Sequence, residues 1–385
     1  MFTNVHNSFL SYSFDDRTDE ELTELDSTHP KIKGLQTKDE LGLYLERVVK
    51  GNDLDRYIRY NSNVERVRKL ENGKWEIAVK RQEKKDGKLV DYWYTQVFDA
   101  IVLANGKTIP ILPNFENLPG FVEKNKDKTF VTLAKAVKDT KFIEKSKKIL
   151  FVGSSNSAID LLQYAFPRDL ENPSIFISRR TKYTGPTGFI GGFTSMSYAK
   201  GVISKPEIEK FLPDENGVLF TDGTIEKNFD SIVICTGYHY CYPFFEKEYV
   251  EKHPSYNHFY LYTFSLEEPT VALVGNKLAP FFFPRVEAQA AAVAGVFSGF
   301  KQLPNPNETN KWYDEKIDQI LTLYDTNEKF IEPLLNFGPK DRPNPLFSVK
   351  RRDDYVADFA QSWRTIEGVY FKLRDGVYTV DNVLS

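Results

Sequence analysis

The stretch that decides the fold is residues 149–160, which read Ile-Leu-Phe-Val-Gly-Ser-Ser-Asn-Ser-Ala-Ile-Asp. The apolar run predicts a buried strand, the glycine predicts a tight turn, and the residues after the turn begin a helix. A strand–turn–helix unit of this kind binds the pyrophosphate of a dinucleotide, because the turn and the helix N-terminus present backbone N–H groups to the phosphates. Its position in the middle of the chain indicates that another element belongs before it.

The glycine turn departs from the usual G-x-G-x-x-G pattern at two positions. Ser155 replaces the second glycine, and Ala158 occupies the third position, where close helix–strand packing favours a small residue. A lone degenerate pattern of this kind also fits an ordinary turn, but the strand before it and the arginines beyond it favour dinucleotide binding. The predicted contacts are those of the turn: Gly153, Ser154, Ser155, Asn156, Ser157 and Ala158.

A pair of arginines follows the next predicted strand, residues 174–178. An NAD-binding site would place an acidic residue here for the ribose diol, whereas this chain reads Ser178-Arg179-Arg180. Arginine binds a phosphate bidentately, so the pair favours NADP with its extra 2′-phosphate. A solvated surface pair is the alternative interpretation.

An internal repeat indicates a second nucleotide unit. The pattern F-D-x-I-V-x-x-x-G occurs at 98–106 and again at 229–237, which is 131 residues later. The second copy closes the unit that Gly153 opens, so the first copy is expected to close a similar unit. None of the glycines in residues 1–97 follows a buried strand, and we therefore expect the first glycine fingerprint to fall before Met1.

Two helices are predicted from capping residues and apolar spacing. A capping box at 37–40 opens a helix that runs to about Val49, with Leu41, Leu45 and Val48 on its apolar face. An alanine-rich segment at 286–298 predicts a slender helix that packs closely on a neighbour or a cofactor. Its first turn and its end are marked by Pro284 and Gly299.

Alternation and turn residues predict the remaining elements. Residues 56–98 read as a β-meander, and residues 220–224 as a hairpin turn. We also expect a helix near 133–138, a fingerprint helix that ends near Pro167, and a surface loop over 184–201.

Composition and charge narrow the function classes. The 385 residues allow two or three domains, and the net charge of −3, with both signs dispersed, argues against a nucleic-acid surface. Two cysteines suit a reducing compartment, and the five histidines show no metal-ligand spacing. The N-terminus lacks signal-peptide features, and the longest apolar helix is too short to span a bilayer. We therefore expect a cytosolic protein without a metal site.

Taken in order, these segments resemble the flavin-containing monooxygenase family. Residues 2–5 look like its Y-T-N-x-P-K segment, and residues 103–106 with Pro110 and Pro113 look like its A-x-G-x-x-x-x-P-x-x-P motif. Gly153 to Ala158 match its NADP fingerprint, and residues 235–238 match its A-T-G-Y motif. The family's closing FAD segment, G-x-x-x-x-x-x-P-x-x-E-x-Q, matches Gly275, Pro284, Glu287 and Gln289.

The resemblance implies an α/β fold with two Rossmann-like dinucleotide-binding domains. The expected FAD domain comprises residues 1–144 and 241–385, is incomplete at its N-terminus, and is split by an NADPH domain at 145–240. Its implied reaction transfers one oxygen atom from O2 to an amine nitrogen or a sulfur of a small molecule, through a hydroperoxyflavin. Oligomers, and association with the cytosolic face of the endoplasmic reticulum, are compatible with it.

The resemblance also assigns residues to these cofactors. Asn4 falls beside the flavin and is the implied catalytic residue. The NADP residues are those of the fingerprint together with Ser178, Arg179 and Arg180. The other cofactor-binding residues are Asn105, Gly106, Thr236, Gly237, Gly275, Pro284 and Gln289.

Two alternatives stay open beside the monooxygenase. The family's identifying motif F-x-G-x-x-x-H falls on residues 125–131, which have lost its Phe, Gly and His, and Ala290 and Ala291 stand where a basic residue usually follows Gln289. These departures favour a pseudoenzyme that binds NADP and acts by interaction or regulation. A dithiol flavin reductase shares the architecture but needs a close cysteine pair, which Cys235 and Cys241 do not provide.

Overall fold

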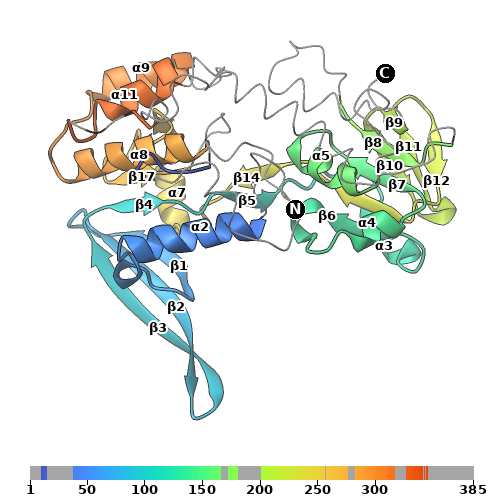
Figure 1. Cartoon of the computed structure of the whole chain (residues 1–385), viewed down its shortest axis with the longest axis horizontal. Helices are drawn as coiled ribbons and strands as arrows, with labels where there is room; N and C mark the ends of the chain where they lie inside the picture. The colour runs from blue at the N-terminus through green and yellow to red at the C-terminus, as the bar shows by residue number, and fades with distance from the viewer. Residues whose placement is uncertain are drawn as a thin grey trace. The chain divides into compact units, whose positions relative to one another are not determined.

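The computed structural model describes residues 10–14, 38–165, 172–180, 201–255, 257–275, 282–316, 327–340, 342, 344 and 345 (Figure 1). Asn4, Pro167 and most of the predicted loop at 184–201 lie outside these residues. The chain forms two compact units, Met1–Lys107 with Tyr240–Tyr355, and Thr108–His239 with Val356–Ser385. The second unit therefore interrupts the first in the sequence, as expected for one α/β domain inserted into another.

The second unit is built on a five-stranded parallel sheet. Its strands lie in the order β6 (Phe130–Leu133), β13 (Ser231–Ile234), β7 (Ile149–Val152), β8 (Ile175–Ser178) and β9 (Val202–Lys205). Every neighbouring pair is parallel. All residues of β7, β8 and β13 are buried, as expected where both faces of a parallel sheet are covered.

Short helices and an antiparallel sheet complete this unit. The helices are α3 (Leu118–Asn125), α4 (Lys141–Lys145), α5 (Asn156–Leu162) and the 3₁₀ turns η3 (Ala134–Ala136), η4 (Gln163–Ala165) and η6 (Pro213–Glu215). The antiparallel sheet is β10 (Ile208–Leu212), β11 (Gly217–Phe220) and β12 (Ile225–Lys227), with the predicted hairpin turn between β11 and β12. Aromatic residues such as Phe121, Phe211 and Phe220 fill the core between these elements and the parallel sheet.

The segment near 133–138 is not the predicted helix. Residues 130–133 form strand β6, which pairs with β13, and only the 3₁₀ turn η3 follows. Strand pairing with a segment about a hundred residues away thus overrides local helix preference. The same pairing draws residues 108–144 into the second unit, so the first boundary falls at Lys107 and not at 144.

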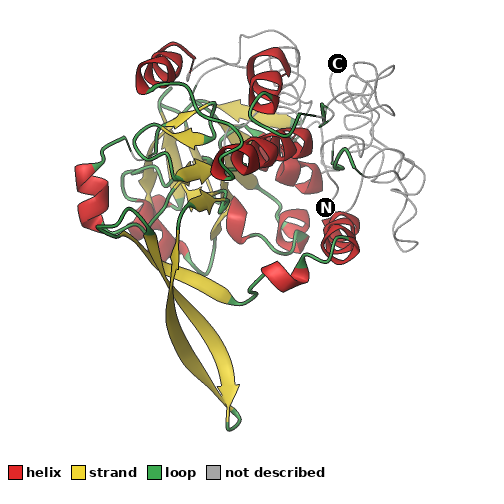
Figure 2. Ribbon diagram, turned by 90° about the vertical axis from the view of Figure 1, so that its left-hand side faces the viewer, coloured by secondary structure: helices red, strands yellow, loops and turns green. Residues whose placement is uncertain are grey.

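The first unit contains the predicted meander and a second sheet. The meander is β1 (Ser62–Lys69), β2 (Trp75–Lys85) and β3 (Lys88–Phe98), and Figure 2 shows β2 and β3 as a long twisted ribbon. The second sheet is β15 (Phe259–Tyr260), β16 (Phe264–Ser265), β17 (Val271–Leu273) and β4 (Ile101–Leu103), in this order. Where the chain passes between the units, β5 (Lys107–Pro110) pairs with β14 (Tyr238–Tyr240).

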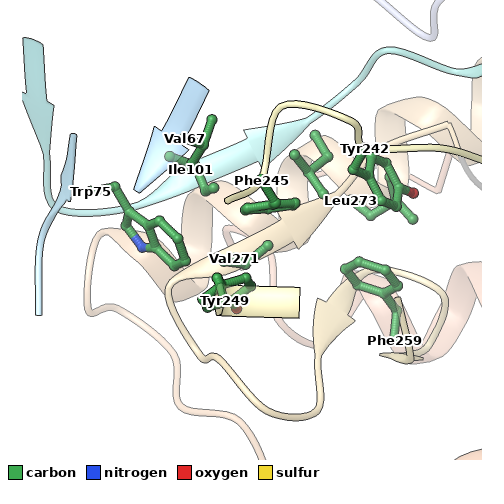
Figure 3. Close-up of a cluster of buried hydrophobic side chains, with 10 residues drawn as sticks. Val67, Trp75, Ile101, Tyr242, Phe245, Tyr249, Phe259, Val271 and Leu273 are labelled. Carbon is green, nitrogen blue, oxygen red and sulfur yellow. The ribbon is translucent and has the colours of Figure 1, made fainter. Parts of the chain in front are cut away.

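A buried cluster joins the two sheets of the first unit (Figure 3). Trp75 of the meander is fully buried beside Phe245 and Tyr249 and makes edge-to-face contacts with both. Its indole N–H donates to Thr270 Oγ1 at 2.9 Å, immediately before β17. The core therefore fixes the meander to the strand whose end carries Gly275.

The described α-helices of this unit are α2 (Lys38–Gly51), α7 (Lys247–Lys252), α8 (Phe282–Phe297), α9 (Pro306–Lys316) and α11 (Glu332–Leu335). A 3₁₀ turn, η2 (Asp55–Tyr57), and a π-helical turn, η7 (Asn327–Ile331), accompany them. The predicted alanine-rich helix is α8, with Pro284 in its first turn and Gly299 at positive φ just after its end. Residues around Phe337 and Gly338 cross this helix at Gly295 and Ala291.

The predicted apolar face of α2 is partly wrong. Tyr44 is the most buried residue of the helix, whereas Leu45 is 39% exposed. Leu41 and Val48 do pack against the small cluster that contains Tyr44. Tyr44 is buried because it packs against the rings of Tyr12 and Phe283, which come from distant segments. The spacing of apolar residues within the helix does not reveal these contacts.

Candidate nucleotide-binding sites

The glycine turn between β7 and α5 lies where the strand order of the parallel sheet reverses. β8 and β9 extend the sheet on one side of β7, and β13 and β6 extend it on the other side. In open parallel sheets, ligands bind at the carboxyl ends of the strands next to such a reversal. Gly153 follows the carboxyl end of β7, beside the end of β13.

Gly153 is required there for two physical reasons. Its φ of +107° is a conformation that side chains with a Cβ rarely adopt. A Cβ would also lie 2.5 Å from the carbonyl oxygen of Cys235, at the end of β13. The Gly153 N–H donates to the carbonyl of Ser178 at 2.8 Å, so the turn is fixed against the ends of both neighbouring strands.

The rest of the turn is open to a ligand. Ser155 and Asn156 are exposed, whereas Ala158 is fully buried against the sheet. The Ala158 N–H donates to the Ser155 carbonyl at 2.9 Å and begins the helix. Small residues around an exposed turn with one packed face fit the backbone contacts that a nucleotide phosphate makes.

The two arginines after β8 differ in exposure. Ser178 is buried, and its hydroxyl donates to the Pro206 carbonyl at 2.8 Å. The Arg179 side chain is only 7% exposed, and its backbone N–H donates to the Lys205 carbonyl. Arg180 is exposed and therefore is the arginine of this pair that is directly accessible to a 2′-phosphate.

Thr236 and Gly237 have structural partners in the second unit. The Thr236 hydroxyl donates to the Ile111 carbonyl at 2.6 Å, and the Ile111 N–H donates to the Gly237 carbonyl at 2.9 Å. Gly237 has a φ of +91°, which explains the glycine. These hydrogen bonds to Ile111 fix the carboxyl end of β13, which lies beside Gly153.

The first unit brings together the residues predicted for the other nucleotide. β4 and β17 run parallel, so the turn with Asn105 and Gly106 and the turn with Gly275 follow the same edge of the sheet. Asn105 Nδ2 donates to the Cys241 carbonyl at 3.0 Å. Gly275 has a φ of +86°, and no atom of the described residues lies within 4 Å of the position that a Cβ would take. This open glycine fits the close approach of a ligand.

Gln289 of α8 positions this glycine turn. Its Oε1 accepts the Gly275 N–H at 2.9 Å, and its Nε2 donates to the Tyr262 carbonyl at 3.0 Å and to Thr263 Oγ1 at 3.1 Å. The side chain is fully buried. It also supports Tyr262 at a φ of +51°, a conformation that is costly for a residue other than glycine.

Replacing Gln289 by leucine is expected to lower the free energy of unfolding by about 2 kcal/mol, because the half-buried Gly275 N–H and the buried Tyr262 carbonyl lose their partner. Urea unfolding followed by circular dichroism measures the change. Gln302→Leu, at an exposed position, is the control and should leave stability within about 0.5 kcal/mol. Equal stability of the two variants would contradict the positioning role.

The sequence did not reveal the partners of Glu287. The carboxylate is 4% exposed, accepts the Ser13 N–H at 2.9 Å and the Ser13 hydroxyl, and binds the Arg342 guanidinium at 2.7 Å. Tyr12 beside it packs edge to face on Phe283, with ring centroids 4.9 Å apart. Glu287, near the N-terminal end of α8, therefore anchors the described segment 10–14, a contact that no local pattern predicts.

Arg285 is a second feature that sequence reasoning missed. It lies in the first turn of α8, is 2% exposed, and burial lowers its pKa to about 10.

Among the described residues, no cluster of His, Cys, Asp or Glu has the arrangement of a metal site. No helix within the described residues is long and apolar enough to cross a membrane.

Comparisons with known proteins agree with this geometry. A family model described as flavin-binding monooxygenase-like matches residues 31–182 and 195–332. Flavin-containing monooxygenase FMO GS-OX-like 9 of Arabidopsis thaliana is 29% identical over 289 residues, which are 72% of this chain and 57% of the relative. The N-oxide-forming dimethylaniline monooxygenase 2 of Oryctolagus cuniculus is 27% identical over 330 residues, covering 68% of this chain and 58% of the relative.

The crystal structure of Tmm from Pelagibacter sp. strain HTCC7211 has the same fold. It superposes with a TM-score of 0.66 at 19% identity, over 95% of this chain and 74% of that one. The chain spans less than 60% of the length of the two curated relatives.

Proposed function

Because the chain belongs to the flavin-binding monooxygenase-like family, we propose that it serves an NADPH-dependent monooxygenase reaction. FAD and NADP are the cofactors of this family. In the proposed reaction NADPH, H⁺ and O2 are consumed, one oxygen atom enters the substrate, and the other leaves as water. The proposed substrate atom is an amine nitrogen or a sulfur, in keeping with the N-oxide-forming activity that the rabbit relative's name states.

The glycine turn at the strand-order reversal is the observation that carries this proposal. We assign the second unit, with Gly153, Ser154, Ser155, Asn156 and Ser157, to the NADP pyrophosphate, since the turn is exposed and Ala158 packs beneath it. Exposed Arg180 is assigned to the 2′-phosphate. Buried Ser178 and Arg179, together with half-buried Thr236 and Gly237, shape the surrounding strand ends.

The first unit is assigned to FAD. Gly275 and Gly106 supply backbone turns at adjacent strand ends, and Asn105 fixes the second of these turns to Cys241. Gln289 and Pro284 act through α8, the first by holding the Gly275 turn and the second by opening the helix. Bound FAD supplies the oxygen-transfer chemistry, and the protein supplies placement and exclusion of water.

Asn4 keeps its proposed role beside the flavin, outside the described residues. The segment that follows it is tied at Ser13 to Glu287, in the helix that also carries Gln289. A catalytic asparagine is thereby proposed to be linked, through a short stretch of chain, to the same helix that positions the flavin turn.

Replacing Arg180 by alanine is expected to weaken NADPH binding about tenfold or more, because a charge-assisted hydrogen bond to the 2′-phosphate contributes about 1.5–3 kcal/mol. NADH, which lacks that phosphate, should bind the variant and the wild type equally. Titration by nucleotide fluorescence measures both constants, and Lys227→Ala serves as the charge-matched control. An equal loss for NADPH and NADH would contradict the assignment.

The pseudoenzyme interpretation remains the second candidate, supported by the altered motif at residues 125–131. Those residues have structural roles: Asn125 Nδ2 donates to the Pro213 carbonyl, and the Thr129 hydroxyl donates to the Phe229 carbonyl. NADPH oxidation with added FAD, an amine or sulfide substrate and labelled O2 separates the candidates. Label in the product supports the monooxygenase, whereas NADPH binding without flavin binding supports the pseudoenzyme.

A further inference from the structure

The β2–β3 hairpin presents an edge strand with no partner among the described residues. β3 is the outer strand of the three-stranded meander sheet, and both views show the hairpin extending away from the other elements of the first unit (Figures 1 and 2). The β2–β3 ladder pairs without interruption from Trp75 opposite Phe98 to Lys85 opposite Lys88. Its outer edge is therefore an uninterrupted row of backbone donors and acceptors along the twisted ribbon.

Both faces of β3 expose apolar side chains. On one face Leu89, Trp93 and Val97 are 65%, 54% and 48% exposed. On the other face the exposed apolar residues are Val90, Tyr92 and Phe98. A strand that covers a core on one side would be polar on the other, so this pattern indicates a surface that is covered on association.

Apart from two charged residues near the hairpin tip, Lys88 and Asp91, β3 lacks the usual protections of an edge strand. It contains no proline, and its ladder with β2 has no bulge, whereas the β1–β2 ladder has one between Val64 and Arg66. Its single acidic side chain, Asp91, is neutralised within the hairpin by Lys80 at 2.9 Å. Lys80 Nζ also lies over the Trp93 ring, 5.8 Å from its centroid, which is within the limit of about 6 Å for a cation–π contact.

We propose that β3 pairs antiparallel with β3 of a second copy of this chain, with Trp93 opposite Trp93 at the twofold axis. A twofold antiparallel pairing is self-complementary, so each contact occurs twice. In this register Leu89 faces Val97 on one side of the joined sheet, and Tyr92 faces Tyr94 on the other. Apolar and aromatic cross-strand pairs of this kind stabilise antiparallel sheets.

Two considerations favour this register over others: it avoids like charges, and it keeps the Leu89–Val97 contact. With Trp93 at the axis, Asp91 faces Thr95 and Lys88 faces Phe98, so no like charges meet. Moving the axis to Asp91 would place two carboxylates opposite each other. Moving it to Tyr92 would pair Leu89 with Thr95 and lose the Leu89–Val97 contact.

A second copy suits the hairpin better than a lipid surface does. The hairpin tip reads Lys84-Lys85-Asp86-Gly87-Lys88, which is charged and not apolar, and therefore resists insertion. Lipid also offers no partners for the unpaired backbone of β3, whereas another strand satisfies all of its outward N–H and C=O groups.

A pair of charge variants tests the register. Leu89→Glu and Val97→Lys each place a charge opposite an apolar residue across the interface, while inside the hairpin they face Lys84 and Glu76, which keeps folding favourable. Each variant alone should weaken dimerisation about tenfold or more. Mixing the two should restore association as a one-to-one heterodimer, since Glu at position 89 then meets Lys at position 97.

Sedimentation velocity over a range of concentrations measures these equilibria for the full chain. Ile225→Glu, a charge at a similarly exposed strand residue of the other unit, is the control and should dimerise like the wild type. Thermal unfolding verifies that every variant is folded. A monomeric wild type, a mixture that fails to reassociate, or a monomer that binds anionic vesicles through the hairpin would each overturn the proposal.

Discussion

Replacing Gly295 by alanine is expected to destabilise the first unit by about 3–4 kcal/mol, because extra volume in a tightly packed crossing forces backbone shifts. A Cβ at this position of α8 would lie 1.8 Å from the carbonyl oxygen of Phe337 and 3.0 Å from its carbonyl carbon. Both contacts are with backbone, so no side chain can turn aside to make room. Either the helix or the crossing segment must move.

Gly42→Ala is the matched control for this prediction. Gly42 also lies within a helix, α2, but a Cβ there would have no atom within 4 Å. Alanine should therefore raise the free energy of unfolding by about 0.5–1 kcal/mol, the ordinary gain from its higher helix propensity. Urea unfolding followed by circular dichroism compares the two, and two changes of the same sign would show that the crossing at Gly295 is not tight.

The crossing also explains the composition of α8. Ala288, Ala291 and Ala292 are all at most 5% exposed, and a Cβ placed on Gly338 would lie 3.4 Å from the Cβ of Ala291. The alanines therefore allow a neighbouring backbone to pack closely, which is one of the two roles that the sequence predicted. The same helix also carries one large polar side chain, Gln289, which holds the Gly275 turn by accepting its N–H.

Local signals in the sequence were sufficient where an element is defined by contiguous residues. The strand–turn–helix at Gly153, the meander and α8 all follow from patterns within one segment. They failed where the decisive contact is distant: β6 exists because it pairs with β13. The buried face of α2 is another example. Tyr44 is buried against the rings of Tyr12 and Phe283, which come from distant segments, and Leu45 beside it is exposed.

The candidate sites follow the same division. The sequence identified the glycine at 153 and the glutamine at 289, but assigned both to direct cofactor contact. In the structure the Gln289 amide is hydrogen-bonded to Gly275, Tyr262 and Thr263. We therefore expect Gln289 to affect a ligand through the turn that it holds. Burial of Arg179 beside exposed Arg180 likewise depends on the packing around β8, which residue identity does not encode.

Replacing Gly153 by alanine is expected to have the largest effect on the second unit, about 4–5 kcal/mol of lost stability together with loss of NADPH binding. The estimate combines the cost of a side chain at positive φ with that of a steric clash. The clash is with the carbonyl oxygen of Cys235, which a Cβ would approach to 2.5 Å, and with its carbonyl carbon at 3.0 Å. Relief requires β7 and β13 to separate at the strand ends where the nucleotide is proposed to bind.

Gly223→Ala separates these two costs. Gly223 belongs to the same unit and has a φ of +81°, but a Cβ there would meet nothing within 4 Å. Its replacement should therefore cost only the conformational part, about 1–2 kcal/mol, and should leave the NADPH dissociation constant unchanged. Thermal unfolding and nucleotide fluorescence measure both variants. If both lost the same stability, the approach of Cys235 to Gly153 would not be a constraint; if Gly153→Ala were destabilised but bound NADPH normally, the turn would serve packing alone, and the nucleotide would have to bind elsewhere.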